Sequence, residues 1–168
     1  MSDRWKPSVT VAAIVERRRG GVREFLLVEE ETPEGLRLNN PAGHLDPGES
    51  PEEAVVREAL EETARVFTPT GLVGIYLSRF RRPARAEDVT YLRLAYAGSV
   101  GEAEPTRALD HGIVRTLWMT LDELKASRER HRSALVLRCI EDLIAGRSFP
   151  LDLVRADPTL YRPEVKDG

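Results

Sequence analysis

One segment constrains this chain more than any other: GHLDPGESPEEAVVREALEETA, residues 43–64, in which a turn-rich loop runs directly into a helix. Ser50 is a favoured N-cap, Pro51 suits the first helical position, and Glu53 completes a capping box. These residues predict a helix that begins at Pro51 and runs to about Ala64.

The predicted helix has two unlike faces. At about 100° per residue, a mostly apolar arc is formed by Val55, Val56, Ala59, Leu60 and Thr63. Glu58, Glu61 and Glu62 lie together on the opposite side, at positions i, i+3 and i+4. Such a row of glutamates is commonly a solvated acidic face. The alternative is a divalent-cation site, because Mg²⁺ prefers oxygen ligands and a cation turns the repulsion among carboxylates into attraction.

The rest of the chain mixes strand and helix patterns. We expect strands at 8–16, 24–30, 70–80, 89–98 and 112–120, a strand running into a loop at 36–45, a basic connector at 81–88, and helices at 121–127 and 133–146. Because strands and helices do not alternate regularly, we expect an α/β fold in which helices cover a mixed sheet. We expect one domain over residues 1–168, with an irregular tail from Phe149.

Composition argues against several classes of protein. Hydrophobic residues make up 41% and charged residues 32%, with a formal net charge of -3, so no overall charge draws the chain to nucleic acid or membrane. The single cysteine, Cys139, forms no disulfide framework and lies in an apolar run that predicts a buried thiol. No apolar run reaches the ~18 residues of a membrane span and no signal peptide is recognisable, so we expect a cytoplasmic protein.

The residues around the helix resemble the Nudix box: Gly, five residues, Glu, seven residues, Arg-Glu, an apolar residue, any residue, Glu-Glu, any residue, Gly, and an apolar residue. The matching positions here are Gly43, Glu49, Arg57, Glu58, Ala59, Glu61 and Glu62. The chain is therefore identified as a member of the Nudix hydrolase superfamily. This resemblance implies an α/β/α sandwich with a mixed sheet.

The chain departs from the box at its end, where Ala64 stands in place of Gly and Arg65 in place of an apolar residue. Glycine adopts a left-handed conformation easily, whereas alanine loses about 1 kcal/mol there. We therefore expect a changed helix exit, with the helix continuing for another turn to Val66 or Phe67, and an unchanged metal site.

The resemblance implies a role for each matched residue. The ligands of Mg²⁺, or of Mn²⁺ in its place, would be Glu58, Glu61, Glu62 and the backbone carbonyl of Gly43. Either Glu61 or Glu62 would take the proton from the attacking water. Arg57 and Glu49 would form a supporting pair that orients a catalytic carboxylate. A simple ion pair between Arg57 and Glu61 is an alternative for the arginine.

Further segments, above all NNPAGH at 39–44, are similar to the NudJ-type phosphatase branch, and this similarity covers a core of about residues 7–154. It implies hydrolysis of a pyrophosphate linkage in a small phosphorylated compound. The substrate types would be nucleoside di- and triphosphates, thiamine pyrophosphate and hydroxymethylpyrimidine pyrophosphate. It implies a small-molecule partner, no nucleic acid polymer and no membrane, and a monomer or dimer.

Weaker candidates for substrate binding lie outside the box: His44, Arg79, Phe80, Arg93 and Asp110. The segment SRFRRPAR gathers arginines around Phe80, which suits phosphate attraction and ring stacking but also a solvated basic loop. Asp110 is either an additional acidic ligand or an exposed loop residue. His44 either meets phosphate or is structural, and Arg93 either reaches the pocket or pairs across strands.

Two other functions stay open at this stage. A Nudix domain that has lost a glutamate can bind a ligand without turnover, although all three carboxylates are present here. Basic residues around an aromatic ring also occur in RNA-binding proteins. Phosphate release with and without Mg²⁺ separates the enzyme from the sensor, and salt-sensitive association identifies an RNA-binding protein.

Overall fold

The computed structural model describes residues 4–82, 86–163 and 165. Its strands are β1 (Ser8–Arg19), β2 (Val22–Thr32), β3 (Gly35–Asn39), β4 (Ala42–His44), β5 (Phe67–Arg82), β6 (Glu87–Val100) and β7 (Ile113–Thr120). Its helices are α1 (Pro51–Thr63), α2 (Leu121–Ala126), α3 (Leu135–Ile144) and the 3-10 turns Arg128–Arg130, Leu151–Leu153 and Pro158–Leu160. Among these described residues, no helix combines the length and apolar character needed to cross a membrane.

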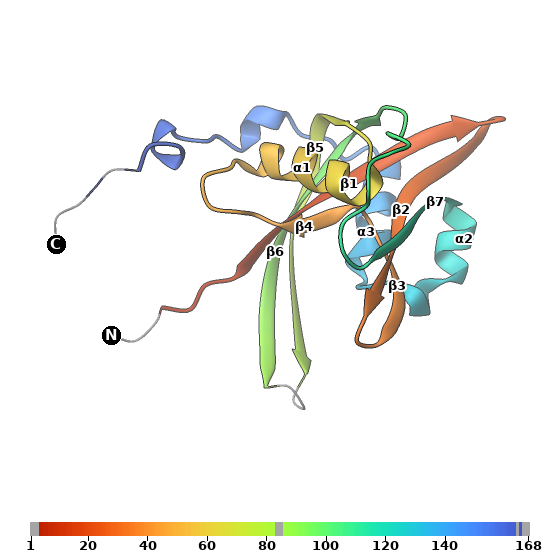
Figure 1. Ribbon diagram of the computed structural model, residues 1–168, viewed down its shortest axis with the longest axis horizontal. Coiled ribbons are helices and arrows are strands. Elements are labelled where there is room, and N and C mark those ends of the chain that lie inside the picture. Colours follow the sequence, from red (N-terminus) through yellow and green to blue (C-terminus); the bar gives the residue numbers. More distant parts are fainter. Residues whose placement is uncertain (1–3, 83–85, 164, 166–168) are drawn as a thin grey trace.

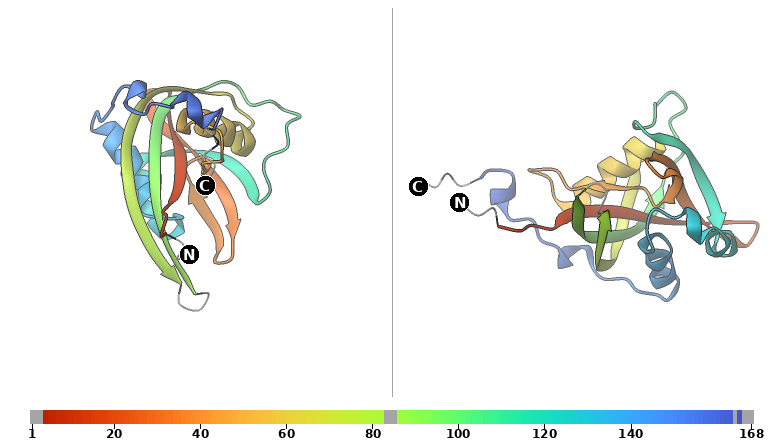
Figure 2. Two further views of the ribbon diagram at one scale, coloured as in Figure 1. Left: turned by 90° about the vertical axis from the view of Figure 1, so that its left-hand side faces the viewer. Right: turned by 90° about the horizontal axis from the view of Figure 1, so that it is seen from below.

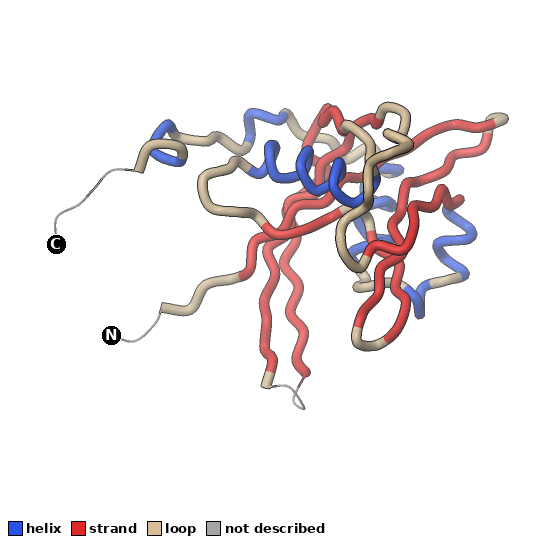
Figure 3. The backbone as a smooth tube through the Cα atoms, in the orientation of Figure 1, coloured by secondary structure: helices blue, strands red, loops and turns tan. Residues whose placement is uncertain are grey.

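Strand β1 organises a seven-stranded mixed sheet in the order β3-β2-β1-β6-β5, with β4 paired to β1 and β7 paired to β2 (Figures 1 and 3). It runs parallel to β6 over Ser8–Val15 and antiparallel to β4 over Thr10–Ala12. Its far end, Glu16–Arg19, pairs with β2. The hairpins β2–β3 and β5–β6 project in the same direction from this centre (Figure 1).

The two faces of the sheet carry separate apolar cores. Val11, Ala13 and Val15 of β1 belong to the core under α1, whereas Ala12 and Ile14 belong to the core under α2 and α3. This alternation follows from the two-residue period of a strand. Helices α1 and α3 therefore lie on opposite sides of the sheet (Figure 2). The α/β/α sandwich with a mixed sheet is confirmed.

Most predicted elements are present, but the exit of α1 and the basic connector differ from the prediction. Helix α1 begins as predicted, with the reciprocal capping box between Ser50 and Glu53. It ends at Thr63, because Ala64 adopts the left-handed conformation at φ 54°, so the predicted extra helical turn is wrong. The predicted basic connector at 81–88 is also wrong at both ends: β5 continues to Arg82 and β6 begins at Glu87, while 83–85 lie outside the described residues.

The C-terminal segment is more structured than the sequence predicts. Phe149 exchanges two backbone hydrogen bonds with Leu72 of β5, and Leu151 and Val154 pack against the core under α1. The hydroxyl of Tyr161 donates to Glu53 in the first turn of α1 at 2.8 Å. This segment therefore ties the end of the chain to the start of the glutamate-rich helix.

Candidate active site

Arg57 joins the loop before α1 to the glutamates on the helix. Its Nε and Nη2 donate to the two carboxylate oxygens of Glu49 at 3.0 and 2.7 Å, and Nη2 also donates to the carbonyl of His44 at 3.0 Å. Its Nη1 donates to Glu58 at 2.8 Å and to Glu61 at 3.1 Å. The expected support by Glu49 and the alternative pairing with Glu61 therefore occur together.

These contacts also shift the pKa values of Arg57 and Glu49. Hydrogen bonding to Glu49 raises the pKa of Arg57, and the same contact lowers the pKa of the Glu49 carboxyl. The amide of Asp46 donates to Glu49 at 2.8 Å and lowers that pKa further. Bidentate arginine–carboxylate pairs are geometrically specific, so Arg57 holds the loop in register with α1.

Glu58 lies directly over Gly43. A Cβ atom at position 43 would fall inside the Glu58 carboxylate, closer than any non-bonded contact allows. Strand β4 therefore needs glycine at this point to let the carboxylate approach the backbone. This contact places the Glu58 carboxylate beside the Gly43 backbone that the sequence singled out as a metal-ligand candidate.

Glu62 is held by Ala42, the residue of β4 next to Gly43. Its Oε2 accepts a hydrogen bond from the backbone amide of Ala42 at 2.8 Å. Both Glu58 and Glu62 are buried, with 9% and 7% of their surfaces exposed, whereas the side chain of Glu61 is 39% exposed. The alternative interpretation of these glutamates as a solvated acidic face is thus wrong for Glu58 and Glu62, because β4 covers that side of α1.

Burial and like charge both act on these carboxylates. Burial raises the pKa of Glu62 to about 8, the Ala42 amide opposes this rise, and the charges of Glu58, Glu30 and Asp110 increase it. Burial also raises the pKa of Glu58, although its hydrogen bond with Arg57 opposes the change. The charges of Glu61 and Asp110 raise it further. The site therefore concentrates negative charge where water is scarce.

The donor set suits a hard divalent cation, since the three box glutamates offer carboxylate oxygens only. In residues 4–82, 86–163 and 165, however, no three His, Cys, Asp or Glu side chains are arranged to hold a metal ion together. Arg57 draws Glu58 and Glu61 to one nitrogen, while Ala42 holds Glu62. Burial is the main cause of the raised pKa values of Glu58 and Glu62, and a cation would relieve the mutual repulsion that adds to it.

Asp110 reaches this cluster from the loop before β7. Its backbone amide donates to the carbonyl of Glu61 at 2.9 Å, and its carboxylate accepts from the amide of His111 at 2.7 Å. The residue is exposed, and its charge acts on both Glu58 and Glu62. Asp110 thus lies at the glutamate end of the site.

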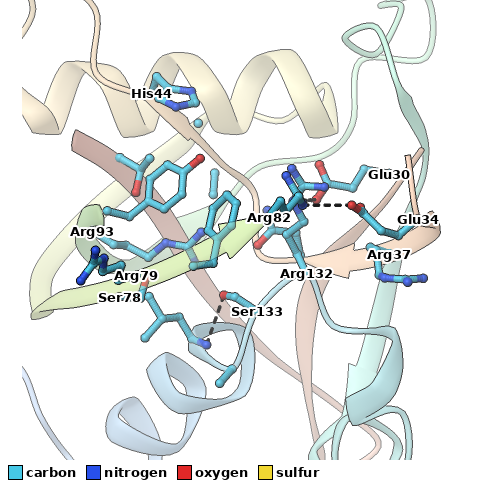
Figure 4. A pocket seen from close by; sticks show the side chains of 18 of the residues that line it. Glu30, Glu34, Arg37, His44, Ser78, Arg79, Arg82, Arg93, Arg132 and Ser133 are labelled. Carbon is cyan, nitrogen blue, oxygen red and sulfur yellow. Dashed lines mark hydrogen bonds and ion pairs between the residues drawn. The ribbon is translucent and has the colours of Figure 1, made fainter. Parts of the chain in front are cut away.

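A cavity of about 710 Å³ opens beside Gly43 between the two projecting hairpins (Figure 4). Strand β4 and α1 lie above it, and the segment leading into α3 lies below (Figure 4). Of the predicted site residues, those lining it are Gly43, His44, Arg79, Phe80 and Arg93. The other predicted site residues, Glu49, Arg57, Glu58, Glu61, Glu62 and Asp110, are not among its lining residues. The basic aromatic segment therefore meets the end of β4 at one cavity, and the glutamates adjoin that cavity through the contact of Glu58 with Gly43.

The aromatic side of the cavity is a stack. The ring of Phe80 lies 5.6 Å from that of Tyr91 at an interplanar angle of 19°, and His44 lies 6.1 Å from Tyr91. The guanidinium of Arg82 lies 4.7 Å from the Phe80 ring centre, and its Nε lies 3.1 Å from Glu34 of the opposite hairpin. Phe80 therefore has Arg82 and Tyr91 as neighbours.

Two predicted basic residues differ in their surroundings. Arg79 is exposed and donates to both oxygens of Asp88 across the hairpin, at 2.7 and 2.6 Å. Arg93 is 8% exposed, and burial lowers its pKa while the charges of Glu30 and Glu62 raise it. Arg93 thus offers a desolvated cation to the cavity, whereas the charge of Arg79 is already paired.

The NUDIX domain family matches residues 6–138 of this chain. The protein belongs to the Nudix family. The matched span includes every box residue and each of the weaker candidates from His44 to Asp110. Nudix hydrolases generally use divalent metal ions, which agrees with the oxygen-only donor set.

Individual relatives agree with this placement. The chain is 32% identical over 151 residues to Phosphatase NudJ of Shigella boydii serotype 4, covering 89% of this chain and 92% of that protein. A NUDIX hydrolase structure from Nitrosomonas europaea is 45% identical, with a TM-score of 0.79, covering 90% of this chain and 98% of that one. The NUDIX domain of Shewanella oneidensis NrtR, solved with ADP ribose, shares the fold at 19% identity and a TM-score of 0.66, covering 84% of this chain and 89% of that one. The protein is a Nudix hydrolase that acts on pyrophosphate bonds.

Sequence reasoning missed several residues of the Nudix cavity: Glu30, Asn39, Tyr91 and Arg132. Tyr91 could have been predicted from the sequence, since it lies two residues from Arg93 on one strand and so shares its face. Glu30 and Asn39 give no local signal, because Glu30 is one of three consecutive glutamates on β2 and Asn39 is one of two consecutive asparagines at the end of β3. Only the pairing of β2 with β3 brings them together.

Proposed function

We propose that this Nudix hydrolase cleaves a pyrophosphate linkage in a small phosphorylated compound with Mg²⁺ as its cofactor. The substrate class is a nucleoside di- or triphosphate, or a diphosphate of thiamine or hydroxymethylpyrimidine type. The observation that carries the proposal is the packing of the buried Glu58 on Gly43, which lines a cavity of about 710 Å³ that has an aromatic wall. The part of the cavity beside Gly43 suits a phosphate group with its metal ion, and the aromatic wall suits a ring.

The metal ligands would be Glu58, Glu61, Glu62 and the backbone carbonyl of Gly43. A bound Mg²⁺, for which Mn²⁺ can substitute, would neutralise phosphate charge and polarise the reacting phosphorus. Asp110 lies close enough to add negative charge to this end of the site, as its effect on Glu58 and Glu62 indicates. Its proposed role is to support cation binding.

Glu61 is the better candidate for the base. Its side chain is 39% exposed, so water reaches it, while Glu62 is buried and engaged by the Ala42 amide. The Glu61 carboxylate would accept a proton from water as the water oxygen attacks phosphorus. The bridging P–O bond then breaks, and the leaving phosphate takes its electron pair. Arg57, anchored by Glu49, positions the Glu61 carboxylate through its 3.1 Å hydrogen bond.

The remaining lining residues suit both the organic part and the phosphate groups of the substrate. Arg93 is a buried cation at the cavity wall and is proposed to contact the substrate. His44 lies next to Gly43, within reach of a phosphate, and Phe80 supplies an apolar ring face. Arg79 is proposed to attract anionic substrates at the rim by exchanging its contact with Asp88.

The direct experiment measures orthophosphate and pyrophosphate release from purified protein, using nucleoside di- and triphosphates and thiamine pyrophosphate. Reactions contain Mg²⁺, Mn²⁺ or excess EDTA. The proposal predicts release with either cation and loss of release in EDTA. Binding of these compounds without release under any of the metal conditions would contradict it and favour a ligand sensor.

A further inference from the structure

The ring of Phe80 already has a neighbour on each side along the β5–β6 hairpin. Tyr91, which is paired with Ser78, lies 5.6 Å from the ring in a stacked arrangement. Arg82, two residues further along β5 and on the same face of the strand, places its guanidinium over the ring at 4.7 Å from the centre. A substrate ring that stacks on Phe80 therefore has to take the place of Tyr91 or Arg82.

Arg82 is the neighbour that can leave. Tyr91 lies within β6 and also has the ring of His44 as a neighbour at 6.1 Å. Arg82 is the last residue of β5, and its side chain is 30% exposed. Its Nη1 donates to Glu87, the residue directly opposite on β6, at 2.8 Å. Because Glu87 belongs to the same hairpin, Arg82 keeps this charge partner when it moves away from the ring.

A second ion pair holds Arg82 from across the cavity. Its Nε lies 3.1 Å from Oε1 of Glu34, in the turn between β2 and β3, and both residues line the cavity (Figure 4). This contact joins the two hairpins that border the cavity. The two side chains are 30% and 40% exposed, and ion pairs this exposed add little to stability, so the contact opens readily.

We propose that Arg82 gates the part of the cavity that receives the substrate ring. The gate is closed while Arg82 lies on Phe80 and pairs with Glu34. It opens when the substrate ring takes the place of Arg82 on Phe80, and Arg82 then remains paired with Glu87. This inference rests on the proposed pyrophosphate hydrolysis and adds a residue that sets affinity for the ring. A binding-competent state that is only partly populated weakens apparent affinity in proportion, so the closed gate weakens binding of ring-bearing substrates and not of inorganic pyrophosphate.

Arg82→Gln tests the gate, because a gate and simple charge attraction predict opposite signs. If Arg82 only attracts phosphate, its loss should raise KM for an anionic substrate. If Arg82 closes the ring-binding part of the cavity, its loss should lower KM for a ring-bearing substrate by about three- to tenfold. The substrate is whichever of ATP, CTP and thiamine pyrophosphate the wild-type full chain hydrolyses fastest with Mg²⁺. Inorganic pyrophosphate, measured by its KM or by its Ki as a competitive inhibitor, is the comparison without a ring.

Glu34→Gln tests the same contact from the opposite hairpin. It should also lower KM for the ring-bearing substrate, and the double variant should match Arg82→Gln alone, because both substitutions open one ion pair. Matched controls remove the same charges elsewhere. Glu31→Gln changes an exposed residue of the same hairpin, and Arg19→Gln changes an exposed residue at the end of β1 that does not line the cavity. Neither control should lower KM.

An unchanged or raised KM for the ring-bearing substrate in Arg82→Gln would overturn the inference while leaving the proposed hydrolysis intact. An equal fall in the KM or Ki of inorganic pyrophosphate would also overturn it, because pyrophosphate has no ring to stack on Phe80. Release from none of the compounds by wild-type protein would instead contradict the hydrolysis itself, and the inference with it. If thermal denaturation shows that Arg82→Gln does not fold, the comparison of Glu34→Gln with Glu31→Gln decides.

Discussion

The carboxylate of Glu58 occupies the space that a side chain at position 43 would need, so Gly43 and Glu58 are matched across the contact between β4 and α1. This contact joins the cavity, which Gly43 lines, to the buried end of the glutamate cluster. A change at either residue should therefore alter catalysis more than stability, because the group that must move is the end of a flexible side chain.

Gly43→Ala tests this relationship. We expect the protein to fold normally and its turnover to fall by about 10²-fold, because a displacement of about 1 Å in a catalytic group has that effect. Steady-state hydrolysis and thermal denaturation provide the two measurements. Gly101→Ala is the control, since a Cβ there meets no neighbouring atom. Full activity in Gly43→Ala would show that the position of Glu58 is unimportant.

The left-handed Ala64 predicts a stabilising substitution. Glycine adopts φ near 54° without the penalty that alanine carries, so Ala64→Gly should raise the free energy of unfolding by about 1 kcal/mol. Activity should not change. Chemical denaturation measures the effect, with Ala59→Gly in the helix interior as a control that should destabilise. A loss of stability in Ala64→Gly would mean that the buried methyl group outweighs the backbone strain.

The sequence predicted structural features that depend on residues close together in the chain. It missed features that depend on contacts with distant segments. Ser50 and Glu53 form the start of α1 within four residues, so their pattern was sufficient. The exit was different, because the carbonyl of Ala64 accepts from the amide of Glu104 at 2.8 Å. That contact with the loop after β6 holds the chain in a turn that alanine itself disfavours.

The candidate active site shows the same contrast between local and distant contacts. The resemblance to the Nudix box predicted the pairing of Arg57 with Glu49, and helical spacing the alternative with Glu61, because all three lie on one loop and helix. Helical periodicity could not reveal that Glu58 and Glu62 are buried, since their cover comes from β4. The roles assigned to the box glutamates stay predictions until activity is measured.

The raised pKa of Glu62 predicts how pH affects stability. Burial favours its neutral form in the fold, so its contribution is present below the ordinary value of 4.5 and is lost as pH rises toward about 8. In EDTA, the wild type should therefore lose more thermal stability than Glu62→Gln between pH 5 and pH 8. Added Mg²⁺ should restore stability to the wild type at pH 8.

The control for this pH effect is Glu52→Gln, which removes an exposed carboxylate from the first turn of the same helix. It should keep the pH dependence of the wild type. If Glu62→Gln and the wild type show the same dependence in EDTA, the burial of Glu62 has no energetic consequence.

Phe80→Ala tests the ring-binding wall. Removing the side chain eliminates the stack with Tyr91 and releases Arg82 from the ring. We expect KM for nucleoside triphosphates to rise by about tenfold, in the range of aromatic contacts worth about 0.5–1.5 kcal/mol. Inorganic pyrophosphate should be affected much less. Leu77→Ala, which alters an exposed residue of the same strand, is the control. Equal effects on both substrates would remove Phe80 from substrate recognition.

Hydrolysis by Glu61→Gln is the most direct test of the central claim that the box glutamates form a metal-dependent catalytic site. Glu61 is partly exposed and accepts from Arg57, so its amide variant should fold and melt like the wild type. The measurement is orthophosphate release from a good substrate at saturating Mg²⁺, alongside wild type with and without EDTA. We predict that turnover falls by about 10²-fold or more in Glu61→Gln and disappears from the wild type in EDTA. Wild-type turnover in folded Glu61→Gln, or hydrolysis that is indifferent to EDTA, would contradict the account.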